Sequence, residues 1–92
     1  MAKFLIEVPH EAEESACLKA IQILLSTGSH YLTHSDWGCR DGVHKSWATV
    51  DVETKEEARA ILPPVYRSQA VIVELNKFSR EEVEKLLRGH ET

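Results

Sequence analysis

The chain has few cysteines, no long apolar run and no surplus of basic residues, and each absence excludes a class of protein. Its two cysteines are too few for the disulfide framework of a small secreted protein. They could form one bridge, but Cys17 lies on the apolar stripe of a predicted helix, where we expect a small buried hydrophobe. The longest apolar stretch, Ile21 to Leu25, contains Gln22 and is too short to cross a bilayer. No secretory signal precedes the first strand-like run, so we expect a reduced, cytoplasmic protein with no membrane partner.

The charge balance argues against nucleic acid as a partner. The chain carries 11 basic and 15 acidic residues, a net charge of −4 with neutral histidines. Nucleic-acid binding needs a basic patch, whereas the basic residues here are scattered among acids. An apolar share of 42% predicts a single domain over residues 1–92 with a thin core, which would gain stability from dimerisation.

Periodicity and capping signals predict an alternation of strands and helices. The expected strands are 3–8, 31–38, 44–52 and 70–75, and the expected helices are 11–27, 54–62 and 79–88. This order, β-α-β-β-α-β with a C-terminal helix, is typical of an α+β, ferredoxin-like sandwich. We therefore expect an antiparallel sheet of order 4-1-3-2 with helices on one face.

The strongest turn signal lies between Trp37 and His44. Asp41-Gly42 is a preferred centre for a two-residue type I′ turn, because glycine accepts positive φ and aspartate comes next best. Such a turn places Cys39 directly opposite His44, with Cβ atoms about 4.5–5.5 Å apart. A thiol and an imidazole at that distance can share a metal, form a hydrogen bond or simply pack.

Topology brings further donors to this end of the sheet, a rim that we define by Cys39, His44 and His10. His10 follows the first strand, which lies beside the strand that starts at His44. A terminal helix packed along the domain would be long enough to bring His90 to the same rim. Cysteine and histidine are common ligands of zinc, nickel and copper, so these four residues form a candidate zinc or nickel site. The Cys–His pair could instead be an activated thiolate, or simple packing.

The sheet face that the helices leave open is the second candidate region. By strand alternation, Trp47 faces away from the helices, together with His34 and Glu7. A second copy of the chain is the simplest cover for such a face, so we expect a homodimer through the open sheet face. His34, Trp47 and Glu7 would then line an enclosed interior, where they either serve acid–base catalysis or form hydrogen bonds across the dimer.

In element order, size and half-apolar sheet face, the chain resembles the dimeric α+β barrel superfamily. That superfamily includes muconolactone isomerase, antibiotic-biosynthesis monooxygenases and stress-responsive barrel proteins. The segments W-G-C-x-D-G-x-H at 37–44, L-P-P-x3-S at 62–68 and L-N-K-F-S at 75–79 are similar to a small bacterial family of about this length. The resemblance implies a homodimer built by sheet-to-sheet packing, with a ligand pocket inside the barrel or between sheet and helices. Some ferredoxin-like dimers bind nickel or other metals.

Three functions stay open from the sequence. The first is a small homodimer that binds a transition metal or a small-molecule ligand at the rim. The second is a cofactor-free isomerase- or monooxygenase-like enzyme, with His34, Trp47 and Glu7 lining a pocket on the open sheet face. The third is a structural or regulatory dimerisation module.

Overall fold

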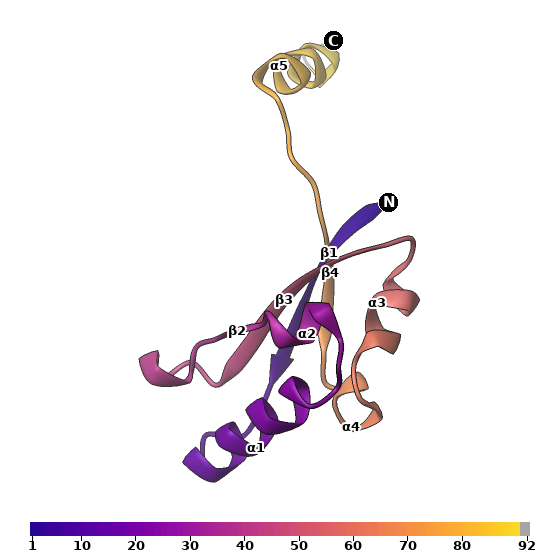
Figure 1. Cartoon of the computed structure of the whole chain (residues 1–92). Helices are drawn as coiled ribbons and strands as arrows, with labels where there is room; N and C mark the ends of the chain where they lie inside the picture. Colours follow the sequence, from indigo (N-terminus) through magenta and orange to yellow (C-terminus); the bar gives the residue numbers. More distant parts are fainter. Residues whose placement is uncertain (91–92) are drawn as a thin grey trace.

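A computed structural model describes residues 1–90 and shows an α+β protein built on a four-stranded antiparallel sheet (Figure 1). The strands are β1 (Ala2–Pro9), β2 (Asp36–Trp37), β3 (Lys45–Val52) and β4 (Val71–Leu75), in the order β2-β3-β1-β4. The helices are α1 (Glu14–Leu25), α2 (His30–Thr33), the 3-10 helix η1 (Cys39–Asp41), α3 (Lys55–Ile61), α4 (Pro64–Arg67) and α5 (Arg80–His90). The predicted strand order and antiparallel pairing are confirmed. Positions 91 and 92, which the predicted domain includes, lie outside the described residues.

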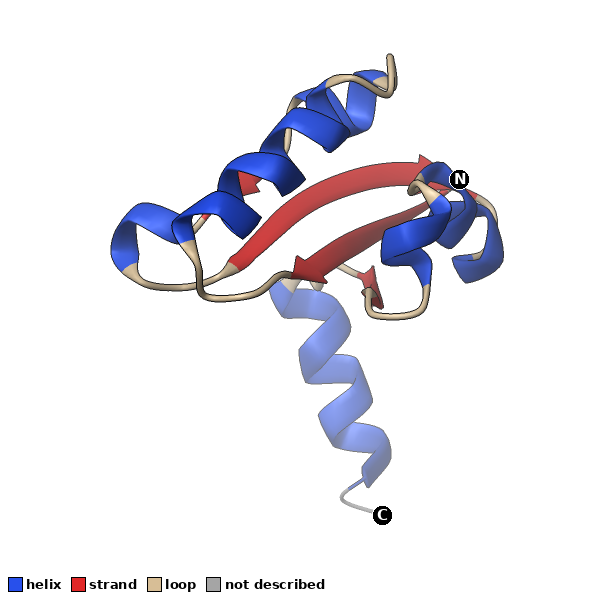
Figure 2. Ribbon diagram, turned by 90° about the horizontal axis from the view of Figure 1, so that it is seen from below, coloured by secondary structure: helices blue, strands red, loops and turns tan. Residues whose placement is uncertain are grey.

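Strand alternation creates the hydrophobic core. In β1 the side chains of Phe4, Ile6 and Val8 are buried, and the residues between them are only partly covered. Phe4 pairs with the buried Val50 of β3, so the two central strands send matching apolar rows to the same side. Figure 2 shows helices over one side of the strands and α5, which ends at the C label, on the other side.

Only Asp36–Trp37 of the segment predicted as a strand over 31–38 is a strand, whereas its first residues belong to α2, so that part of the prediction was wrong. Ser29 caps α2, because its hydroxyl accepts a hydrogen bond from the backbone N–H of Leu32 at 3.3 Å. The same turn buries Leu32 in the core. The serine cap and this burial outweigh the strand-like alternation, so His34 ends a helix instead of lying on the sheet.

The tip of the β2–β3 hairpin also differs from the predicted type I′ turn. Asp41 belongs to η1, and Gly42 takes the left-handed conformation at φ 78°. Single αL positions suit glycine, whereas aspartate there is strained, so a longer loop with one such position replaces the two-residue turn. Trp37 pairs with Ser46, which is the register that a reversal centred on Asp41-Gly42 requires. The turn type was wrong, whereas the register was predicted correctly.

The C-terminal helix α5 lies beyond the end of the sheet, as Figure 1 shows. The hydroxyl of Ser79 caps it by accepting from the backbone N–H of Glu82 at 3.1 Å, which confirms the predicted start. The expectation that this helix packs along the domain was wrong. Because β1 carries His10 at its opposite end, His90 does not join the rim. None of the helices within residues 1–90 has the length and hydropathy that a bilayer crossing requires.

Candidate metal centre

Three side chains from separate segments meet at the rim. One nitrogen each of His10 and His44 and the sulfur of Cys39 lie within 4.8 Å of one another. His10 follows β1 and His44 precedes β3, directly beyond the last β1–β3 pair, Pro9 with Lys45. The backbone N–H of His10 donates to the carbonyl of His44 at 3.0 Å, which continues the ladder by one step and fixes both histidines side by side.

The imidazole of His10 contacts both other members of the cluster. Its Nε2 is 3.2 Å from Cys39 Sγ, within hydrogen-bond range. Its ring contacts that of His44 edge to face, with centroids 5.8 Å apart, and the indole of Trp37 at 5.9 Å. Two imidazoles and one sulfur form a donor set of the kind that zinc and nickel accept, so this group could hold a metal ion.

Two nitrogens of this cluster are shielded from solvent and have no hydrogen-bond partner within residues 1–90. They are Nδ1 of His10 and Nδ1 of His44. A buried polar atom without a hydrogen-bond partner costs about 1–3 kcal/mol, so two such atoms in one cluster require an explanation. An ion bound to Nδ1 of His44 would supply a partner there, because a neutral imidazole offers a lone pair that a cation can accept. His10 faces Cys39 through Nε2, so an ion in the cluster does not account for its Nδ1.

The charge state of His10 also favours ligation. Burial, and then the nearby charge of His44, lower the pKa of His10 from its ordinary value. A lowered pKa keeps the imidazole neutral at neutral pH, and the neutral form is the one that binds metals.

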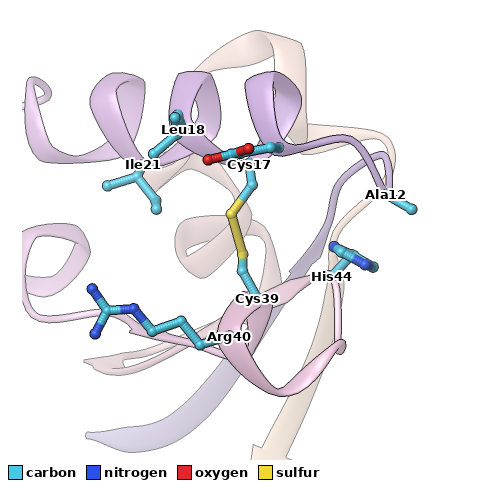
Figure 3. Close-up of a pocket in the computed structure, with 8 residues that line it drawn as sticks. Ala12, Cys17, Leu18, Ile21, Cys39, Arg40 and His44 are labelled. Carbon is cyan, nitrogen blue, oxygen red and sulfur yellow. A yellow bond between two sulfur atoms is a disulfide. The ribbon is translucent and has the colours of Figure 1, made fainter.

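A disulfide joins Cys39 to Cys17, as Figure 3 shows. Cys17 lies on the buried face of α1, and this face is turned toward η1, so its helical position does not prevent the bridge. The expectation that Cys17 is only a core hydrophobe was therefore wrong. Its helical stripe was visible in the sequence, but no local signal shows that this stripe faces Cys39. In the bridged form Cys39 has no thiolate, which is the species that ligates metals.

A cavity of about 480 Å³ lies beside this disulfide. Figure 3 shows its lining: Leu18 and Ile21 on α1, Arg40 on η1 and His44 at the end toward β3. Both cysteines contribute to the wall, so a small molecule or ion can approach the sulfurs from this side.

The residues predicted for the open sheet face are brought together only in part. Trp47 Nε1 donates to Glu7 Oε1 at 3.0 Å, and Lys45 Nζ lies 3.5 Å from Glu7 Oε2. His34 ends α2, where its Nδ1 lies 2.7 Å from the carbonyl oxygen of His30. The structure thus pairs Glu7 with Trp47 and holds His34 on a separate element.

Comparison of the chain with protein-family models, with curated proteins and with solved structures gives no significant match.

Proposed function

We propose that this protein binds a transition metal at the rim when Cys39 is a free thiol. The observation that carries the proposal is the three-atom cluster of His10, Cys39 and His44, whose ligand atoms lie within 4.8 Å of one another. Zinc and nickel are the expected ions, because their sites combine imidazole and thiolate. A cytoplasmic location belongs to this proposal, since thiols are kept reduced there.

The spacing of the donors supports a tetrahedral ion. Zinc bonds of about 2.0–2.3 Å place neighbouring ligand atoms roughly 3.3–3.8 Å apart. The separation between His10 Nε2 and Cys39 Sγ is 3.2 Å, and the remaining separations are at most 4.8 Å. Small side-chain rotations are therefore enough to bring all three donors onto one ion.

The test is metal binding by the reduced, metal-free chain, followed with zinc, nickel and cobalt. We expect one equivalent to bind and to raise the midpoint of thermal unfolding. Free metal at 100 times the Kd should add about 2.7 kcal/mol to the free energy of unfolding. His10→Ala and His44→Ala should abolish the tight site, whereas His34→Ala, which removes an exposed imidazole elsewhere, should leave it intact. A reduced chain that binds none of these ions contradicts the proposal.

A finer fold assignment, the ferredoxin-like and dimeric α/β barrel type, accompanies this function, with a second copy covering the open sheet face. Its support is the strand order and the exposure of two β4 valines, Val71 at 48% and Val73 at 42%. Apolar side chains aligned on a sheet face are stabilised by a cover. Val73→Asp should yield monomers by light scattering, while Asp51→Asn on β3, which β1 separates from β4, should not. A native chain that is monomeric at micromolar concentration contradicts this assignment.

The isomerase- or monooxygenase-like alternative has less support. The Glu7 carboxylate already accepts from Trp47 and pairs with Lys45, which suits a structural role. His34 lies on another element, against His30. We therefore do not propose an enzymatic function for these residues.

A further inference from the structure

We infer that Cys17 is the fourth ligand of this centre, so that the disulfide and a Cys2His2 metal site are alternative states of the same four side chains. The inference rests on the proposed function, because it completes the site formed by His10, Cys39 and His44. It adds a ligand from α1, and it makes metal binding depend on the redox state of the cysteines.

Position is the first argument for Cys17. Its sulfur is bonded to that of Cys39, which in turn lies 3.2 Å from His10 Nε2. No other thiol is present in the chain. The Cα atoms of the two cysteines are 6.9 Å apart, which leaves room for both thiolates on one ion through side-chain rotation alone. The backbone of α1 and η1 can therefore stay in place.

Coordination chemistry is the second argument. A structural zinc site is closed by four protein ligands, and the rim cluster supplies three. Two thiolates and two neutral imidazoles balance the charge of a divalent cation, which suits a partly buried position. Cys17 is 7% exposed, so its sulfur would close the site on the protein side and shield the ion from water.

The exchange between the two states balances in electrons and protons. A dithiol reductant donates two electrons and two protons, the S–S bond breaks, two cysteine thiols form and the reductant leaves as a disulfide. The divalent ion then displaces one proton from each thiol to solvent. Because the sulfurs that bind the ion are those that form the bridge, the two states exclude each other. The cavity that both cysteines line gives the reductant access (Figure 3).

The experiment uses cobalt as a spectroscopic probe of the full chain, with three variants. Reduced wild type should bind one cobalt with tetrahedral ligand-field bands and thiolate-to-cobalt absorption from two sulfurs. Cys17→Ser should halve that absorption and weaken binding by about 100-fold or more, beyond the 10–100-fold cost of losing an outer-shell partner. Cys39→Ser should lose the same absorption. Leu18→Ser, the same replacement one residue further along α1, should match wild type.

A second measurement needs no variant. Zinc added to the reduced wild-type chain should protect both cysteines from alkylation, as counted by mass spectrometry, and the oxidised chain should bind no cobalt. Equal cobalt absorption and affinity in wild type and Cys17→Ser, or protection of Cys39 alone, would overturn the role of Cys17 and leave the three-residue site standing. Cobalt binding by the oxidised chain overturns the exclusion of one state by the other. A reduced wild type that binds no metal refutes the proposed function itself.

Discussion

The two ends of the sheet differ in how firmly the neighbouring helices are attached to it. At the rim, side chains from four segments converge, and a disulfide links α1 to η1. At the other end, α5 begins at a well-formed serine cap and then projects away from the strands (Figure 1). A serine cap is therefore enough to start α5, whereas cross-links and packing determine whether a helix packs against the sheet.

This difference has a thermodynamic side. Cross-linking at the rim restricts the unfolded chain, whereas the apolar residues of α5 stay largely in solvent, with Leu87 56% exposed. Changes at the rim should alter global stability, and changes on α5 should alter only local helix content. Four measurements test this contrast.

The largest effect is expected from the bridge. Under oxidising conditions, Cys17→Ser should lower the free energy of unfolding by about 3 kcal/mol, because it opens a loop spanning a sequence separation of 22. In the presence of a reductant and a chelator, wild type and variant should unfold at nearly the same denaturant concentration. An equal loss of stability under both conditions would mean that packing of Cys17, and not the bridge, holds α1 to the rim.

The next effect concerns two glycines of the hairpin tip. A Cβ at Gly38 would lie 2.7 Å from the carbonyl oxygen of Val43 and 3.0 Å from the Trp47 ring, so Gly38→Ala should cost about 1–3 kcal/mol. Gly42 has open space around it but a φ of 78°, so Gly42→Ala should cost only about 1 kcal/mol, from backbone strain. Urea unfolding of both variants measures the two losses of stability. A greater loss for Gly42→Ala than for Gly38→Ala contradicts the expected order.

Two serine caps compare a helix that packs on the core with one that does not. Ser29→Ala removes the cap of α2, whose Leu32 belongs to the core, and should lower global stability by about 1 kcal/mol. Ser79→Ala removes the cap of α5 and should reduce helical circular dichroism while leaving the main unfolding midpoint in place. If both variants shift that midpoint equally, α5 folds as one unit with the sheet.

The smallest effect is expected on the outer face of α5. Leu87→Gln should change global stability by less than about 0.5 kcal/mol, as exposed substitutions usually do. Thermal unfolding at several protein concentrations provides the measurement. A larger loss that grows with protein concentration would show that Leu87 is covered by another copy of the chain.

The sequence was sufficient for the parts of the fold that depend on local pattern. Strand alternation predicted that Trp47 faces away from the helices, and the residues on either side of it in β3 are buried. Short connections limited the strand order to the one observed. Asp41-Gly42 predicted the register of the hairpin, although the tip relaxes into η1 and Gly42. Such features need only neighbouring residues and the rules of chain connection.

Other features depended on contacts that no local pattern contains. The residues around Leu32 form a helix despite their strand-like alternation, because a serine cap and a core contact stabilise it. These interactions have energies similar to strand propensity. The meeting of Cys17 with Cys39 depends on how α1 rotates over the sheet, and the direction of α5 depends on a link without repetitive structure. Three of the four proposed ligands were thus predictable from topology, whereas Cys17 was not and His90 was misplaced.

The hydrogen bond from the His10 amide to the His44 carbonyl fixes the two imidazoles, but not the two sulfurs, to the sheet. Both imidazoles are anchored to the two central strands of the sheet, while the sulfurs sit on α1 and η1 at its margin. An exchange of bond for ion would therefore leave the strands unchanged and be confined to the side chains that α1 and η1 carry.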